Sequence, residues 1–255
     1  MRGRTGGQDH PRADVALRRG ALPVRGSATL AALAGLVAVA GVGIGGPVAG
    51  ASQGSSQYAA LKKALFVRSD FPSGWSGPGK VTTSNGGGGG FPGQAQLASC
   101  IGVSQSLLNE HSPTATSPNF QDKAGTHYVQ DNANSFPSTK VANQQYAAIS
   151  DPKVPSCLTT DLQTPAAKQQ LESSMNGTIG TVTVAASNPA ALVRHSSGFV
   201  ISFPATVQGV MADVTITVIS MVRGTTGHQI SFTSVGTPFS AAFEHHLVTV
   251  AYGRT

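Results

Sequence analysis

Histidines are the residues of this chain best suited to acid-base or metal chemistry, and the sequence holds seven of them. The run Glu244-His245-His246 has the composition of a ligand cluster, but neighbours on a helix point about 100° apart, so the three side chains cannot converge as HExxH ligands do. We expect His246 on the apolar face of a helix and His245 in solvent. The other candidates stand alone as surface or strand residues: His195, His228, His111 and His127. The sequence therefore predicts no metal site.

Short motifs of known active sites occur without the context that their chemistry needs. Ser150 to Lys153 satisfies SxxK, the nucleophile motif of penicillin-recognising enzymes, but no SDN or KTG accompanies it. Gly41 to Gly46 satisfies GxGxxG but lies in an apolar segment rather than between a strand and a helix. The glycine run after Asn85 lacks the Lys-Ser or Lys-Thr of a phosphate loop. GxSxG is matched by Gly50 to Gly54, but this match spans the expected signal cleavage site and lies outside the expected domain, so no nucleophile elbow is expected. The sequence predicts no catalytic residue, no cofactor and no enzymatic activity.

A candidate ligand groove can be assigned to four polar residues near the most regular part of the chain. Arg194 and His195 stand near the start of the predicted sheet, where they could line a cleft. Asp213 is the one carboxylate in an otherwise uncharged strand, with plain solvent exposure as the alternative interpretation. With His228 these residues form the predicted groove, although none has a chemical partner nearby in the sequence.

The elements that must position these residues are strands, because 192–235 alternates with a period of two. From Ala212 onward Val214, Ile216 and Val218 alternate with more polar residues, which is typical of a half-buried strand. The segment 223–227 predicts a turn, and alternation resumes over 229–235, so a hairpin follows. An antiparallel sheet is therefore the expected scaffold.

Helical spacing and capping residues predict the flanking elements. Helices are expected over 58–66, 94–109 with Cys100 on the buried side, 138–149 capped by Ser138, and from Thr164 to Gly177; strands are expected over 128–136 and 182–186. Thr237 and Pro238 predict the start of a last helix with an apolar face of Phe239, Ala242, Phe243, His246, Leu247 and Val250. The expected fold class is α+β, with a twisted antiparallel sheet flanked by helices in one domain over 58–255, after a polar leader at 52–57.

The first 51 residues have the composition of an export signal. Six arginines precede an uncharged stretch over 28–51, which ends in the A-x-A site Ala49-Gly50-Ala51. We expect cleavage before Ser52 and a secreted or envelope location outside the cytoplasm. An uncleaved membrane anchor is the alternative, because 24 residues could cross a bilayer. A lipid anchor is not expected, since Ala51 stands where a lipobox needs Cys.

The basic charge of the chain lies mostly in this leader. Its first 26 residues hold six of the 17 basic and two of the 11 acidic residues, which leaves 11 basic and nine acidic residues in the mature part. A nucleic-acid partner, which would need a clustered basic face, is therefore not expected. Contact with a membrane is expected only through the signal segment, if that segment is kept.

Two cysteines, Cys100 and Cys157, both follow the expected cleavage site. In an oxidising compartment such a pair predicts a disulfide, and two unpaired buried thiols are the alternative. A disulfide would close a loop of about 57 residues and stabilise the fold by roughly 4 kcal/mol in the chain-entropy model.

Several motifs together resemble a known family. They are the turn Asp70-Phe71-Pro72-Ser73-Gly74-Trp75, a cysteine-containing helix, Ser117-Pro118-Asn119-Phe120, the stretch from Phe136-Pro137-Ser138 to Cys157-Leu158, a paired sheet and a final amphipathic helix. Over about 57–252 the chain resembles small secreted actinobacterial domains related to the extracellular sensor domain of PknH-type kinases and to PsbP-like envelope lipoproteins. The resemblance implies a sheet flanked by helices and a role in sensing or envelope binding. This chain departs from it in having no kinase domain, two cysteines where the kinase sensor has four, and Ala51 in place of the lipoprotein cysteine.

Export, a paired cysteine and absent catalytic motifs predict a secreted, non-enzymatic domain that binds an envelope ligand or a partner protein, in a groove between sheet and helices. A secreted hydrolase is the first alternative, and it requires His195 or His228 to touch both a serine and a carboxylate. A structural surface protein with a flat surface is the second.

Overall fold

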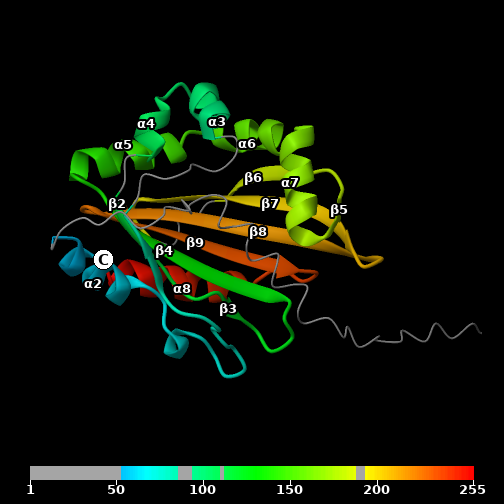
Figure 1. The fold of residues 1–255 in the computed structure, drawn as a ribbon, viewed down its shortest axis with the longest axis horizontal. Coiled ribbons are helices and arrows are strands. Elements are labelled where there is room, and N and C mark those ends of the chain that lie inside the picture. The colour runs from blue at the N-terminus through cyan, green and yellow to red at the C-terminus, as the bar shows by residue number, and fades with distance from the viewer. Residues whose placement is uncertain (1–52, 86–93, 110–111, 188–192) are drawn as a thin grey trace, which may run out of the picture.

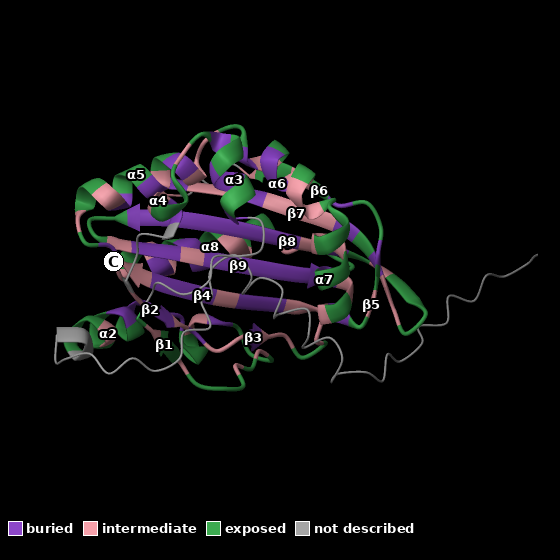
Figure 2. Ribbon diagram, turned by 45° about the horizontal axis from the view of Figure 1, so that its top comes forward, coloured by how far each residue is buried: buried purple, intermediate pink, exposed green. Residues whose placement is uncertain are grey.

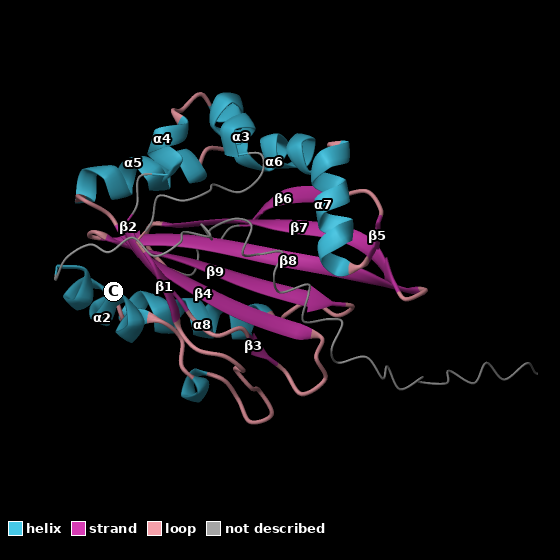
Figure 3. Cartoon of the chain, in the orientation of Figure 1, coloured by secondary structure: helices cyan, strands magenta, loops and turns pink. Residues whose placement is uncertain are grey.

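The computed structural model describes residues 53–85, 94–109, 112–187 and 193–255. The expected export signal, the glycine run, His111 and the turn expected at Asn188-Pro189 lie outside these ranges. Within them the chain forms a nine-stranded antiparallel sheet and seven α-helices, which confirms the α+β class (Figure 3). None of the described helices is long and apolar enough to cross a membrane.

The sheet is built from strands that follow one another mostly through tight connections. The strands are β1 (Thr82–Ser84), β2 (Ser112–Thr116), β3 (Phe120–Gln121), β4 (His127–Ser135), β5 (Gly177–Ile179), β6 (Thr183–Ser187), β7 (Ser196–Val207), β8 (Val210–Arg223) and β9 (Thr226–Val235). The spatial order is β1-β2-β4-β9-β8-β7-β5, with β3 paired to β4 and β6 paired to β7. The two longest strands, β7 and β8, therefore lie inside the sheet, next to the central strand β9.

Two hairpins join the strands β7, β8 and β9. The period-two pattern predicted the second hairpin, between β8 and β9. Gln208 and Gly209, both with positive φ, form the two-residue connection between β7 and β8. Positive φ at both central positions is typical of the type I′ turn, whose twist matches that of the strands it joins. Gly224 begins the equally short connection between β8 and β9.

The helices are arranged on both faces of the sheet. They are α2 (Gln53–Ala64), α3 (Gln94–Ile101), α4 (Gln105–Asn109), α5 (Thr139–Ile149), α6 (Val154–Leu162), α7 (Pro165–Met175) and α8 (Ala241–Gly253). One face of the sheet packs against α8 and α2, and the other packs against α3 to α7, which cover β6, β7 and β8 (Figures 1 and 2). These two surfaces are called the α8 face and the α6 face below.

The period of two assigns each strand residue to one of these faces, because directly paired residues point the same way. Phe199 on β7 and Val218 on β8 are paired and belong to the core under α6. Ile219 on β8 and Ile230 on β9 are paired and belong to the core under α8. The sheet thus separates two apolar cores.

Side-chain caps confirm two of the predicted helix starts. Ser138 Oγ accepts a hydrogen bond from the Val141 N–H at 3.3 Å, and Thr164 Oγ1 accepts one from the Ala167 N–H at 3.3 Å. Such caps satisfy backbone donors that the first helical turn leaves free. The cap of α7 at its other end is Asn176 in the left-handed region, rather than the expected glycine that follows it.

Three local predictions are wrong, each for a backbone reason. The helix expected over 94–109 is two helices, because Gly102 with φ +76 interrupts it, and Cys100 lies on the exposed side. The region near Pro113, expected only to break a helix, forms β2 at a register irregularity. The last helix begins at Ala241, since Ser240 and not Thr237 provides the cap. His246, expected on the apolar face, is exposed, because the buried face of α8 consists of Leu247, Val248 and Ala251.

Two long-range links hold the outer segments to the domain. The predicted disulfide is present: Cys100 on α3 and Cys157 on α6 are bonded, with a Cα–Cα distance of 6.0 Å. At the other side, Arg254 donates to both carboxylate oxygens of Asp70, at 2.6 and 2.8 Å, and to the Leu65 carbonyl at 2.7 Å. These contacts join the end of α8 to the segment that follows α2.

Candidate functional site

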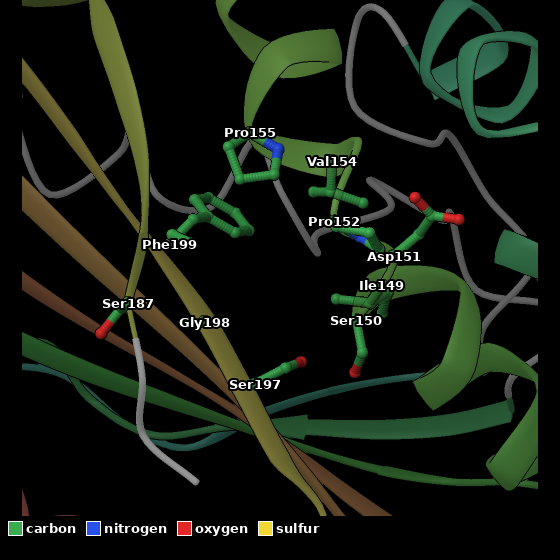
Figure 4. A pocket seen from close by; sticks show the side chains of 11 residues that line it. Ile149, Ser150, Asp151, Pro152, Val154, Pro155, Ser187, Ser197, Gly198 and Phe199 are labelled. Atoms are coloured by element: carbon green, nitrogen blue, oxygen red, sulfur yellow. The ribbon is translucent and has the colours of Figure 1, made fainter.

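A cavity of about 110 Å³ lies on the α6 face, between the α5–α6 connection and the strands β6 and β7. Its walls include Ser150, Asp151 and Pro155 from the helical side and Ser187, Ser197 and Phe199 from the sheet (Figure 4). The name α5–β7 cavity is used for it below. The volume is several times that of one water molecule but below the 300–1,000 Å³ of pockets that enclose a drug-sized ligand. It therefore fits one small ring or one end of a larger molecule.

Two serine hydroxyls in this cavity lack hydrogen-bond partners. Ser150 Oγ and Ser197 Oγ are buried, and neither has a partner in the structure. Figure 4 shows both side chains on the cavity side of their backbones, from opposite walls. A buried hydroxyl without a partner costs roughly 1–3 kcal/mol, so two in one cavity indicate a place where a polar ligand would be stabilised.

The position of Ser150 follows from the end of α5. The backbone N–H of Ser150 closes the helix by donating to the Tyr146 carbonyl at 2.9 Å, and Asp151 then accepts from the Lys153 N–H at 2.8 Å. This turn lets the chain reverse into α6 at Val154, whose side chain is buried. The cavity wall is thus a capped turn between two packed helices, which gives it a defined shape.

A row of neutral polar side chains leads from the cavity across the sheet. Pairing in the register places five residues side by side on the α6 face, one on each of β7, β8, β9, β4 and β2: Ser197, Ser220, Gln229, Asn132 and Thr116. The name polar row is used for these five residues. It spans four strand spacings, about 19 Å. Ser197 belongs to both the row and the cavity, so the two features are continuous.

The rows on either side of the polar row add two more unpaired polar atoms. Thr114 on β2, 5% exposed, has no partner for its Oγ1, and Gln130 on β4 has none for its Oε1. Both side chains point to the α6 face, because Thr114 pairs with Asn134 and Gln130 pairs with Ser231. The helices α3 to α7 lie mainly over β6, β7 and β8, but the α6 face of the neighbouring strands is also shielded from solvent, with Asn132 5%, Ser220 8% and Ser231 2% exposed. The polar row is therefore largely buried, and its Ser197 end lines the α5–β7 cavity.

The four residues of the predicted groove are not brought together. Arg194 and His195 are exposed just before β7, and His195 has a left-handed backbone with its ring 5.8 Å from that of Tyr146. Asp213 is exposed at the opposite end of the sheet. His228 is fully buried on the α8 face.

His228 was expected to stand alone, and that expectation is wrong. Its Nδ1 lies 2.9 Å from Asp131 Oδ1, and both side chains are completely shielded from solvent. His228 Nε2 and Asp131 Oδ2 have no partner. The pair lies 97 residues apart in sequence and sits in the core under α8 and α2, so neither residue contributes to the α5–β7 cavity.

This geometry does not meet the condition set for a hydrolase. A serine nucleophile needs a base within hydrogen-bond distance and access for substrate. His228 contacts a carboxylate but no serine hydroxyl in the described structure, and His195 contacts neither. No group of three or more His, Cys, Asp or Glu side chains in the described ranges could hold a metal ion.

Asp122 and Glu244 are two of the three described carboxylates whose pKa values are shifted; burial raises the pKa of the third, Asp161 on α6. Burial raises the pKa of Asp122, but hydrogen bonds from the Thr126 and His127 backbone N–H groups and from the His127 ring outweigh it, so the net pKa is lowered. Burial on the side of α8 that faces the sheet raises the pKa of Glu244, and a hydrogen bond with Thr217 on β8 partly opposes this rise. Asp122 and Glu244 both lie away from the α5–β7 cavity, and their protonation affects the stability of the fold.

Comparisons with known proteins find only a distant similarity. No family model matches the chain, and no curated protein matches it. Among solved structures, the extracellular domain of PknH from Mycobacterium tuberculosis matches with 12% identity and a TM-score of 0.47, covering 82% of this chain and 97% of that one. This is the protein type named by the sequence resemblance, but at this level the match assigns neither a family nor a function.

Sequence reasoning missed the residues that form the cavity and the row. Ser150 was considered only as a nucleophile, and Ser197, Gln229 and Asn132 carried no motif. The available signal was the run of neutral polar residues at alternate positions of β4 and β9, Gln130, Asn132, Gln229 and Ser231 among them. Alternation identifies such residues as one face of a strand, but only the register shows that these faces adjoin.

Proposed function

We propose that this chain is a non-enzymatic ligand-binding domain that works outside the cytoplasm, in the cell envelope or secreted. The observation that carries the proposal is the α5–β7 cavity, in which the unpaired hydroxyls of Ser150 and Ser197 face one another across the walls. The disulfide between Cys100 and Cys157 supports the location, because such bonds persist in oxidising compartments. The export signal expected over 1–51 agrees with it.

The cavity is the core of this proposed site, because Ser220 and Asn132 of the polar row are only 8% and 5% exposed. At about 110 Å³ the cavity encloses only part of a typical ligand. Binding at this face needs no residue of the catalytic types, which is why a binding role fits the arrangement.

The test is a bulky substitution in the cavity wall. Ser150→Trp should fill the cavity and abolish the thermal stabilisation that any ligand found by screening envelope lipids, glycans and peptidoglycan fragments gives to the wild type. Ser156→Trp is the matched control, since Ser156 is exposed on α6 outside the lining. Ligands that stabilise both variants equally would show that the site lies elsewhere, and failure of every compound class to stabilise the wild type would refute the proposal.

A further inference from the structure

The strand β6 is an edge of the sheet with an exposed outer side. In the described part of the chain β6 pairs with β7 alone, and no other described segment hydrogen-bonds to the backbone of Thr183–Ser187. Three residues of this strand, Thr183, Ala185 and Ala186, are exposed. An antiparallel strand directs alternate backbone N–H and C=O groups away from its partner, so β6 offers donors and acceptors along its outer side.

The positions next to β6 on this edge have their backbone groups satisfied by side chains. On β5 the Ile179 N–H donates to Glu172 Oε1 of α7 at 3.1 Å. Just before β6 the Val182 carbonyl accepts from Gln163 Nε2, at the end of α6, also at 3.1 Å. Within the described ranges no side chain does the same for the outer side of β6, and the strand lacks the charged residues and Pro that protect many edges from pairing. The unprotected part of this edge is therefore β6.

The α5–β7 cavity opens beside one end of β6. Ala186 lines the cavity and is also exposed, so the cavity reaches the surface at this strand, and Ser187 forms the adjoining wall (Figure 4). Ala186 pairs with Phe199, which lies on the α6 face. Directly paired residues of an antiparallel sheet point to the same face. On a strand added beside β6, the residue opposite Ala186 would therefore point toward the cavity.

The groups that line the cavity favour a neutral polar side chain in that position. The hydroxyls of Ser150 and Ser197 have no partner, and each can both donate and accept, as an amide or another hydroxyl requires. The first turn of α6 also lines the cavity, and helix N-termini favour anions. Here, however, Pro155 has no N–H, and the Val154 N–H is bonded to the Asp151 carbonyl at 2.9 Å. The Asp151 carboxylate would in addition repel an anion.

We infer that the ligand of this site is an extended peptide segment, which adds as a strand to β6 and places one amide or hydroxyl side chain in the α5–β7 cavity. The inference rests on the proposed function and deepens it by naming the ligand class. In strand addition, main-chain hydrogen bonds supply affinity and side-chain pockets supply specificity. A small sugar or a lipid headgroup would use the cavity but leave the edge of β6 unpaired.

The experiment is a selection from a library of random decapeptides on the purified protein, followed by calorimetric titration of the strongest binder. Peptides thereby join the compound classes of the screen for the proposed function. N-methylation of the peptide removes backbone donors and leaves the protein unchanged. Two methyl groups on the alternate amides that face β6 should weaken binding by about 4- to 140-fold, because each lost hydrogen bond is worth roughly 2- to 12-fold. Methyl groups on the two intervening amides should leave affinity nearly unchanged.

Amide hydrogen exchange and cavity variants locate the bound peptide. The peptide should protect the amides of β6 and leave those of β1, an edge strand that does not line the cavity, unchanged. Ser150→Ala and Ser197→Ala should each weaken binding by about 2- to 12-fold without lowering the unfolding temperature, because neither hydroxyl has a partner in the structure. Ser99→Ala is the matched control, since Ser99 is exposed on α3 outside the cavity.

The outcomes separate the ligand class from the site. Protection of β6, loss of affinity with one set of alternate methyl groups only, and weakening in both cavity variants support the inference. A peptide that protects β1 in place of β6, or that tolerates both sets of methyl groups equally, overturns it. Protection of β6 in the protein alone, with a doubled mass in sedimentation, overturns it in favour of a second copy of the chain.

Two results distinguish failure of the inference from failure of the proposed function. If no peptide binds, but a sugar, a lipid or inorganic phosphate stabilises the wild type and not Ser150→Trp, the peptide class is wrong and the proposed function stands. If neither peptides nor these compounds bind, the proposed function fails together with the inference.

Discussion

Loss of the Cys100–Cys157 disulfide should lower the stability of the whole domain. The bond joins residues 57 positions apart and links α3 to α6, so it restricts a long loop of the unfolded chain. In the chain-entropy model a loop of this length contributes about 4 kcal/mol. For a domain of this size, 1 kcal/mol corresponds to about 2–4 °C in unfolding temperature, so reduction should lower the midpoint by about 8–16 °C.

The measurement is thermal unfolding by circular dichroism, of the protein with and without reductant and of the Cys100→Ala variant. Reduction changes no side chain beyond the two thiols, which makes it the cleanest perturbation. Cys100 is exposed, so the alanine variant removes the bond without opening a cavity and should match the reduced wild type. Intact mass should rise by two hydrogens on reduction. A reduced protein that unfolds within about 2 °C of the oxidised one would refute the claim that this loop governs global stability.

Substitutions at three further positions test the charged groups. Glu244→Gln should stabilise the domain, because the raised pKa of Glu244 means that its ionised form is disfavoured in the folded state. The gain in stability over the wild type should be absent below the pKa of the unfolded state and should grow as pH rises. Urea unfolding from pH 3 to 8 measures this gain. Asp122→Asn should destabilise the domain, because the lowered pKa of Asp122 means that its ionised form is stabilised in the folded state. The loss of stability should be largest at neutral pH and should vanish as pH falls through the pKa of the folded state. A loss that does not depend on pH would contradict a role for the ionised carboxylate. Arg254→Ala should lose about 2 kcal/mol by urea unfolding, with Arg254→Lys recovering part of it, since only arginine makes the bidentate contact.

Local features of this fold could be predicted because their causes are local. Period-two alternation gave the strands that became β8 and β9, and the caps Ser138 and Thr164 marked the starts of α5 and α7. The cysteine pairing also followed from counting, since two cysteines allow only one intramolecular bond.

Errors arose where several local signals competed. Thr237 and Pro238 have the composition of a helix start, but Ser240 provides the cap. The buried stripe of α8 is Leu247, Val248 and Ala251, so His246 is exposed and Glu244 lies half-buried against Thr217. Because neighbouring residues of a helix point about 100° apart, a stripe centred one residue away from the expected one is enough to turn His246 toward solvent.

The sequence by itself determined the alternation of strands, most helix positions, the α+β class and the disulfide, because each depends on neighbouring residues or on a count. Only the tertiary structure decided which residues meet. The pairing of His228 with Asp131, and the alignment of Ser197 with Gln229 and Asn132 across the sheet, depend on the register between strands that are far apart in sequence. Register is set by which faces of the whole sheet are buried under α6 and α8, and no single strand carries that information.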